Sequence, residues 1–391
     1  MQTPPIRTIT LGIAEPHPLS HETVQRAASI LRQAQTRCTE AGYEVQTIRL
    51  STRSLFDDLP DSSPIELQDY AQELQRVLDD VGLNFCSLGT ANVTRPDFLL
   101  ERINLIPDLL SNYSALNATV QLASLEYGLR ADAALPTARI MKRLAQETEE
   151  GFGNFRFAML ACVAPGCPFF PSAYHAGPTS LSLGVQGANI LISALQSPQN
   201  ESPINLIQIT EAITTALIEQ ATPIVALVQS FAREHNLAFG GIDLSPAPMG
   251  ENSIAAAIEQ CGYGFIGTAG TVAVAAAITA ALKNTQLPAC GYSGLMLPVL
   301  EDAVLGRRWE EGLLSAHQLL LYSAICGTGL DTLPLPGDIP SESISHLLLD
   351  VATLALRLNK QLSARLFPVP AKRTGDHTEF TSPYLTNTIV K

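Results

Sequence analysis

Hydrophobic and polar positions alternate along the N-terminal part of the chain in a regular order, with short β-rich runs followed by stretches of helical spacing. The run at 7–13 reads RTITLGI and predicts a strand, whereas 21–41 places apolar residues such as Val24 and Leu31 on one helical face. The alternation continues as far as FRFAMLACV, a long apolar strand predicted at 155–163. Strands separated by helices of this length need crossover connections, which predicts parallel strands in one sheet covered by helices.

The same periodicity sets the other predicted elements. We expect strands at 7–13, 44–51, 84–88, 118–123, 155–163, 181–185 and 238–244, and helices at 21–41, 65–81, 97–110, 137–148, 206–234, 254–261, 315–326 and 342–359. The stretch 261–282 lacks charge but is built of Gly, Ala and Thr, so we expect a helix packed inside the protein rather than a membrane span. A loop is expected at 327–341. No low-complexity linker or repeat interrupts the chain, which predicts a single α/β domain over 1–391.

Composition narrows the function classes. Charged residues make up 16% of the chain and hydrophobic residues 46%, so we expect much surface to be hidden in the fold or in a homo-oligomer. A net charge of −13 repels nucleic acids and anionic membranes, and neither is expected as a partner. Seven cysteines without a CxxC pair argue against a disulfide framework or a zinc cluster. The first residues lack a basic stretch followed by an apolar one, so a cytoplasmic location is expected.

Two short motifs resemble known sites without the context that those sites need. The string 262–267 reads GYGFIG, but it follows a predicted helix and has no acid about 20 residues later, so no nicotinamide cofactor is expected. The string CGYSG at 290–294 is similar to a serine-hydrolase elbow, yet Leu295 stands where the second glycine belongs. Ser293 is therefore expected to contact a substrate rather than to act as a nucleophile.

Acidic residues in apolar or Gly- and Pro-rich turns are the main candidates for chemistry. Asp243 follows a predicted strand, and the carboxyl end of a parallel strand faces the crevice where ligands bind. Asp243 and Asp331 are predicted to be catalytic, and Asp302 and Asp338 to hold a metal, because converging carboxylates bind hard cations or divide acid and base roles. The open alternative is that each carboxylate caps a helix or accepts from a turn amide.

One histidine and two arginines complete the predicted site. His175 follows a predicted strand in PFFPSAYHAGP, a rigid Pro- and aromatic-rich loop that suits a catalytic base. Arg156 and Arg365 are predicted to bind a substrate carboxylate or phosphate, since a guanidinium fork matches such groups. Ordinary ion pairing is the alternative for both.

Four long strings carry a resemblance to a known family: 154–175, 242–248, 290–302 and 326–338, the last reading CGTGLDTLPLPGD. They resemble domain-of-unknown-function family 711, whose members are often labelled pyruvate-formate-lyase-like, and the resemblance runs over essentially the whole chain. It implies a single large α/β barrel of about ten strands in two parallel halves, surrounded by helices and similar to glycyl-radical enzymes. The tail string RTGD at 373–376 lacks the aromatic residue of a radical-glycine loop, so no glycyl radical is expected.

The resemblance supplies no reaction, so function is inferred from the candidate residues. The leading hypothesis is a non-radical enzyme that acts on a small polar or carboxylate-bearing metabolite by acid/base chemistry, with help from a divalent cation left open. The alternative is a non-catalytic metabolite-binding or regulatory protein, because one fold hosts many functions. Whether the chain is an enzyme stays open at this point.

Overall fold

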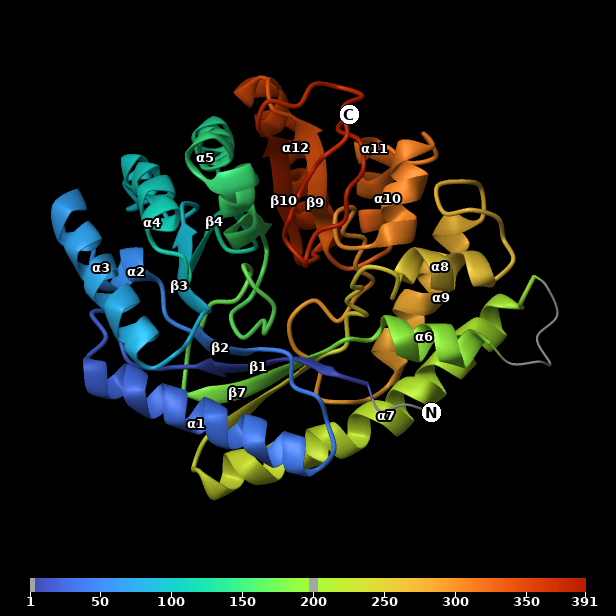
Figure 1. Cartoon of the computed structure of the whole chain (residues 1–391), viewed down its shortest axis with the longest axis horizontal. Coiled ribbons are helices and arrows are strands. Elements are labelled where there is room, and N and C mark those ends of the chain that lie inside the picture. Colours follow the sequence, from blue (N-terminus) through green and yellow to red (C-terminus); the bar gives the residue numbers. More distant parts are fainter. Residues whose placement is uncertain (1–3, 197–202) are drawn as a thin grey trace.

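A mixed β-sheet wrapped by helices organises the chain (Figure 1). The structure is a computed structural model that describes residues 4–196 and 203–391. Its strands are β1 Ile6–Gly12, β2 Ile48–Ser51, β3 Cys86–Asn92, β4 Leu116–Ser124, β5 Gly128–Leu129, β6 Phe157–Ala161, β7 Ser180–Val185, β8 Ala238–Asp243, β9 Gly329–Pro336 and β10 Leu362–Val369.

Helices fill most of the connections between these strands. The α-helices are α1 His21–Glu40, α2 Leu55–Asp58, α3 Pro64–Asp80, α4 Ile106–Asn112, α5 Ala134–Glu147, α6 Ala188–Leu195, α7 Leu206–Glu234, α8 Ile254–Gln260, α9 Thr271–Asn284, α10 Ala303–Glu310, α11 Ala316–Ser323 and α12 Ser341–Leu358. In the described part of the chain, three 3₁₀ segments add to them: η1 Leu100–Leu105, η2 Ala131–Ala133 and η3 Glu149–Arg156.

Within the described residues, ten strands form one sheet in the order β8-β7-β1-β2-β3-β4-β6-β10-β9, with β5 paired to β4. The strands β1, β2, β3, β4 and β6 run parallel to one another. The pair β7–β8 and the pair β9–β10 are each parallel internally but antiparallel to that central group. The sheet is therefore mixed, with about the expected number of strands arranged as a central parallel group and two flanking parallel pairs that run the other way.

The strands formed by residues 4–196 and 203–391 do not close into a barrel, which corrects the expected architecture: their sheet ends at β8 and at β9. An irregular segment, 288–300, lies against both ends. The Cys290 amide donates to the Ile242 carbonyl of β8 at 3.0 Å, and the Val299 amide donates to the Asp331 carbonyl of β9 at 3.2 Å. Each edge is thus covered by backbone hydrogen bonds that are too few and too irregular to make an eleventh strand.

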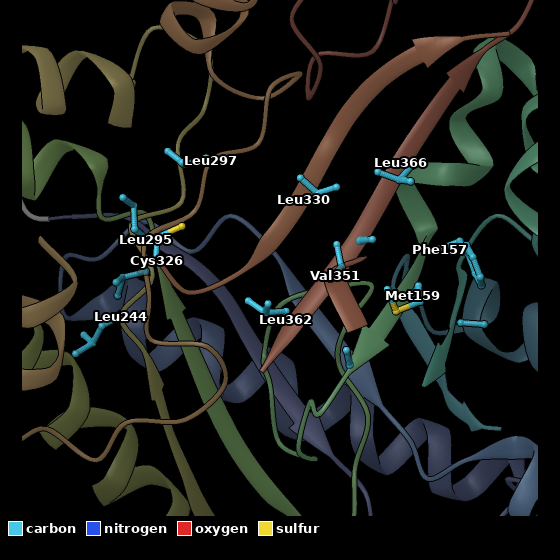
Figure 2. Packing of buried hydrophobic residues seen from close by; sticks show 14 of the residues in the cluster. Phe157, Met159, Leu244, Leu295, Leu297, Cys326, Leu330, Val351, Leu362 and Leu366 are labelled. Atoms are coloured by element: carbon cyan, nitrogen blue, oxygen red, sulfur yellow. The ribbon is translucent and has the colours of Figure 1, made fainter. Parts of the chain in front are cut away.

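The two faces of the sheet have different side chains because residues alternate along each strand. In β4, Leu116 and Val120 are buried in the main hydrophobic cluster, to which α4, α5 and α12 contribute. Asn117 and Gln121 point to the other face, where Gln121 donates from Nε2 to the carbonyl of Val163 at 3.0 Å. The sheet thus packs its apolar face on helices and keeps a polar face inside its curve. Figure 2 shows the apolar packing along β6, β9 and β10.

The interior of the curve is filled by two loops, 163–178 and 288–300. The Thr10 hydroxyl of β1 donates to the Pro168 carbonyl of the first loop at 2.8 Å. The Tyr292 hydroxyl lies 2.9 Å from the Ser172 hydroxyl and so joins the two loops. Loop backbone and hydroxyl groups therefore satisfy part of the polar inner face, whereas the Thr119 hydroxyl and Oε1 of Gln121 have no partner among the described residues. The space that the loops leave unfilled becomes the candidate site.

The segment predicted as a loop at 327–341 contains β9, and β10 was not predicted at all. Pro334 and Pro336 favour a loop because proline cannot donate to a sheet. β9 is an edge strand, however, and an edge tolerates proline where the missing amide would have no partner. Pro368 lies in the half of β10 that pairs with β9 but not with β6. Position in the sheet, which the sequence does not reveal, explains both errors.

The apolar helix expected inside the protein is found as α9, which packs along α7. Among the described residues, α7 is the one helix that is long and apolar enough to cross a membrane. It packs against α1, α6 and α9, and its Ile213, Leu217 and Ile224 are fully buried. These contacts pack one face of α7 against the rest of the protein, which is compatible with a soluble fold.

Candidate active site

A cluster of buried charges lies at one end of the polar inner face. In the described part of the chain, the side chains of Arg7, Arg49, Glu301, Asp331 and Arg365 line one cavity of about 390 Å³. Each of the five is between 6% and 9% exposed. Buried charges are rare unless they are paired, so their convergence marks the cavity as a candidate site.

Irregularities in the sheet direct three of these side chains. The pairing of β1 with β7 shifts register around Arg7, and the pairing of β9 with β10 shifts at Asp331, Thr332 and Arg365. A β-bulge bends the strand and re-aims side chains, which is why bulges are frequent beside active sites. Thr332 has a φ of 39°, a left-handed conformation that a β-branched residue rarely adopts. Its carbonyl accepts from the amide of Leu300 at 3.3 Å, which fixes the chain just before Glu301.

Arg365 bridges the two carboxylates. Its Nε lies 2.7 Å from Oδ1 of Asp331, and its Nη2 forms a close ion pair with Oε1 of Glu301. Arg7 approaches the other oxygen of Glu301, with 3.6 Å between Nη2 and Oε2. Burial raises the pKa of Glu301, and neighbouring Asp331 adds to that effect, while Arg365 and Arg7 oppose it. Burial works against the charge on Arg365, but Asp331 and Glu301 outweigh it and raise its pKa.

Arg49 is the charged residue of the cluster that lacks a counter-ion. Its guanidinium carbon lies 5.0 Å from the centre of the Phe85 ring and 5.3 Å from that of Phe170. Its Nε donates to the Thr47 hydroxyl at 3.0 Å, but among residues 4–196 and 203–391 no carboxylate pairs with it. Burial lowers the pKa of Arg49 to about 9, nearby Arg7 contributes, and Glu301 opposes the shift from beyond ion-pair distance. The guanidinium still carries its charge at neutral pH and faces the cavity with free donors.

The walls of the cavity are largely apolar and aromatic. The Phe155 ring packs under the guanidinium of Arg365 at 4.9 Å and stacks on Tyr384 with 6.0 Å between ring centres. The aromatic and sulfur-bearing residues that line the cavity are Phe85, Phe155, Phe169, Phe170, Tyr384, Met249 and Met296. The site is therefore a pocket of small-molecule size in which aromatic rings lie against the charged groups.

Comparison with known proteins places this architecture in a family. A family model described as "Uncharacterised ACR (DUF711)" matches residues 1–382. The chain belongs to the DUF711 family. A UPF0210 protein of Thermoanaerobacter is 30% identical over 96% of this chain and 88% of its own length. A UPF0210 protein of Listeria monocytogenes is 27% identical over the same shares, and one of Methanococcoides burtonii 31% over 79% of this chain and 71% of its own.

The expected family is thus confirmed for this DUF711 chain, and no reaction comes with it. The family description says that its members are uncharacterised, and the relatives' names state no activity. Neither mentions pyruvate formate-lyase, so that label finds no support.

The structure brings together two of the residues predicted for the site, Asp331 and Arg365. Sequence reasoning left Arg7, Arg49 and Glu301 out of the predicted site. The sequence offered one signal: Arg7 in RTITLGI and Arg49 in TIRLS each stand in a predicted strand. A charged side chain is rarely buried in a strand unless it has a partner or faces a polar cavity. Glu301 gives a weaker signal, because it stands next to Asp302 in a turn.

Asp243 and Ser293 lie together but are not among the residues that line the cavity. The fully buried Asp243 carboxylate accepts from the amides of Ser245 at 2.9 Å, Tyr292 at 2.8 Å and Ser293 at 3.0 Å. Burial raises the pKa of this carboxyl group. The Ser293 hydroxyl donates to the Cys290 carbonyl at 3.0 Å. These contacts hold the 290–294 loop against β8.

His175 and Arg156 are also occupied by main-chain groups outside the cavity. The Nε2 of His175 lies 3.1 Å from the Pro178 carbonyl, and burial lowers the pKa of its ring. The Nη1 of Arg156 donates to the carbonyls of Tyr113 and Leu116 at 2.8 and 3.0 Å. Arg156 thus ties the C-terminal cap of α4 to the first residue of β4.

The two predicted metal ligands lie in different surroundings. Asp302 is buried and accepts from the amides of Ile254 at 2.8 Å and Leu305 at 2.9 Å, so it caps both α8 and α10. Asp338 is exposed in the turn after β9. Over the described residues, no group of three or more His, Cys, Asp or Glu side chains is arranged to hold a metal ion.

Proposed function

We propose that this protein binds a small anionic metabolite in the cavity between β1, β2, β9 and β10, and acts on it by acid/base chemistry. The observation that carries the proposal is the unpaired, buried guanidinium of Arg49. A buried charge without a counter-ion is costly, and a bound anion would supply one. The fork of an arginine also matches the oxygens of a carboxylate or phosphate.

Glu301 and Asp331 are the proposed proton-transfer groups. Both line the cavity, and the Arg365 side chain fixes their positions. A catalytic acid or base works best when its pKa lies near the operating pH, and burial shifts the pKa of Glu301 upward in that direction. Asp331 keeps its predicted role in this proposal, whereas the contacts of His175 and Asp243 give no support to theirs.

Arg49→Gln tests the anion site. We expect anionic metabolites to stabilise the wild-type protein in a thermal-unfolding screen, because a ligand that binds the native state raises the melting temperature. The variant should bind the same ligand about 30-fold more weakly, which corresponds to roughly 2 kcal/mol for a lost charged contact. Arg143→Gln is the matched control, since Arg143 is partly exposed and pairs at the surface with Asp108 and Glu147. If Arg49→Gln and Arg143→Gln bound the ligand with equal affinity, Arg49 would not be part of an anion site.

Glu301→Gln tests the acid/base step and its pH dependence. Protonation of Glu301 removes one negative charge beside Arg7, Arg49, Asp331 and Arg365, so anion affinity should rise as pH falls through the raised pKa of Glu301. In the variant this pH dependence should disappear, and turnover should fall about 100-fold or more while the ligand still binds. Calorimetric titration across pH and product analysis by mass spectrometry measure the two effects. If Glu301→Gln turned over the ligand as fast as the wild type, Glu301 would not be the proton-transfer group.

A non-catalytic binding or regulatory protein is the second candidate, and one observation favours it. Arg365 and Arg7 occupy three of the four oxygens of Glu301 and Asp331, which leaves little free capacity for proton transfer. A binder would return its ligand unchanged after long incubation, whereas an enzyme would consume it. We also propose, from composition alone, a cytoplasmic homo-oligomer without nucleic-acid or membrane partners.

A further inference from the structure

The charges inside the cavity do not balance. Of the five buried ionisable residues, the described chain contributes three arginines and two carboxylates, an excess of one positive charge. Glu44 also lines the cavity, but its side chain is exposed, so water screens it. An occupant that balances the buried groups therefore carries one negative charge. A phosphate or dicarboxylate dianion would reverse the imbalance and leave one negative charge uncompensated.

The setting of Arg49 limits the shape of that anion. Phe85 and Phe170 each lie about 5 Å from its guanidinium carbon with 6.4 Å between the two ring centres, so the rings pack side by side against the group, whose N–H bonds all lie in its own plane. Its unused N–H donors therefore point along the plane of the guanidinium, and this geometry matches a planar carboxylate in a bidentate contact. The described lining residues include no lysine and no glycine-rich loop, which are common partners of phosphate.

Two further aromatic residues of the lining favour a flat apolar body. Phe155 and Tyr384 stack with 22° between their ring planes, and Phe169 and Met296 also line the space. Tyr384 lies beyond residue 382, where the match to the family model ends. Its backbone is held by a turn in which the amide of Leu385 donates to the Ser382 carbonyl at 3.2 Å. The C-terminal segment of this chain thus supplies one aromatic wall of the cavity.

We infer that the ligand is a monocarboxylate whose carboxylate meets Arg49 and whose planar, apolar body lies against Phe155 and Tyr384. This inference rests on the proposed function and specifies its substrate class. It assigns Tyr384 as a specificity-determining residue, because a smaller side chain there would remove one flat wall while leaving the anion site intact.

Benzoate is the test probe, with acetate, succinate and inorganic phosphate as comparison anions, titrated into the full chain by calorimetry and by ligand-observed NMR. We expect benzoate to bind at least tenfold more tightly than the other three. Tyr384→Ala should lower the affinity for benzoate at least fivefold and leave the affinity for acetate unchanged. Tyr384→Phe should keep the wild-type affinity for benzoate. Tyr127→Ala is the matched control, since Tyr127 is 45% exposed and lies outside the cavity.

The outcomes separate this inference from the proposed function. Tighter binding of phosphate or succinate, abolished by Arg49→Gln, would overturn the monocarboxylate class and leave the anion site standing. Benzoate binding that Tyr384→Ala does not change would overturn the role of Tyr384. If none of the four anions binds in a manner that depends on Arg49, both the proposed function and this inference are wrong.

Discussion

Arg365→Met should lower the free energy of unfolding by about 3–5 kcal/mol, the cost of removing one partner from a buried ion pair. Arg365 holds both Asp331 and Glu301, and all three side chains are more than 90% buried. Without the guanidinium, two carboxylates would face each other in a space of low dielectric constant, with Arg7 at 3.6 Å as the remaining close cation. Urea unfolding at neutral pH, followed by circular dichroism, measures the loss.

Arg143→Met provides the control for Arg365→Met. Arg143 also contacts two carboxylates, at 2.7 Å from Asp108 and 2.8 Å from Glu147, but these groups are 36–39% exposed. Surface ion pairs contribute about 0–1 kcal/mol, so the control should change little. Adding Glu301→Gln and Asp331→Asn to Arg365→Met should recover part of the lost stability, because the uncompensated charges are gone. Equal losses in the two single variants would mean that water in the cavity, and not Arg365, solvates the carboxylates.

The defect of Arg365→Met should shrink as pH falls. Burial already raises the pKa of Glu301 in the native protein, and removing Arg365 removes a group that lowers it. A carboxyl group whose folded pKa lies above its unfolded value takes up its proton first in the folded state, so the folded state gains stability as pH falls through that window. Unfolding measured at neutral pH and near pH 5 should therefore show a smaller difference from wild type at the lower pH.

Local patterning was sufficient for much of the fold but not for its edges. The strand predicted at 7–13 and the helix at 21–41 are found as β1 and α1, because their alternation reflects burial on one face. The strand at 155–163 begins two residues late, since Phe155 and Arg156 still belong to η3. β9 and β10 escaped prediction because proline signals a loop unless the strand lies at a sheet edge, and that position depends on distant pairings.

The candidate site, like the sheet edges, could be predicted only in part from the sequence. Asp331, Asp243 and Arg156 share the feature that draws attention in a sequence, a polar residue in an apolar segment. In the structure Asp243 and Arg156 bond main-chain groups, whereas Asp331 meets the side chain of Arg365 across a strand pair beside a cavity. The sequence reveals that a buried polar group needs a partner, but the fold decides whether that partner is backbone or a ligand site. The surroundings of Arg49 cannot be predicted from local sequence, because its neighbours Phe85 and Phe170 are distant in the chain.

Asp243→Asn should destabilise the fold by about 2–3 kcal/mol, the range for lost charge-assisted hydrogen bonds and an amide left unsatisfied. The carboxylate accepts three backbone amides, two at Oδ1 and that of Tyr292 at Oδ2. An asparagine that keeps its carbonyl at the Oδ1 position would turn its NH₂ toward the Tyr292 amide, so two donors would oppose each other. The loop backbone packs tightly against this side chain, since a Cβ placed on Gly291 would come within 2.1 Å of Oδ2 of Asp243. Little room is therefore left for the loop to adjust to an asparagine.

Asp376→Asn is the control for Asp243→Asn, since Asp376 also accepts a backbone amide, that of Arg373 at 2.7 Å, but is exposed. Asp376→Asn should lower the free energy of unfolding by no more than about 1 kcal/mol, because water can replace the hydrogen bond to the Arg373 amide. The comparison decides between two roles for Asp243. A variant that unfolds early but turns over ligand normally below its transition would show that the carboxylate holds the 290–294 loop. A variant as stable as wild type that had lost turnover would instead make Asp243 a reacting group and move the chemistry from the Arg365 cluster to the end of β8.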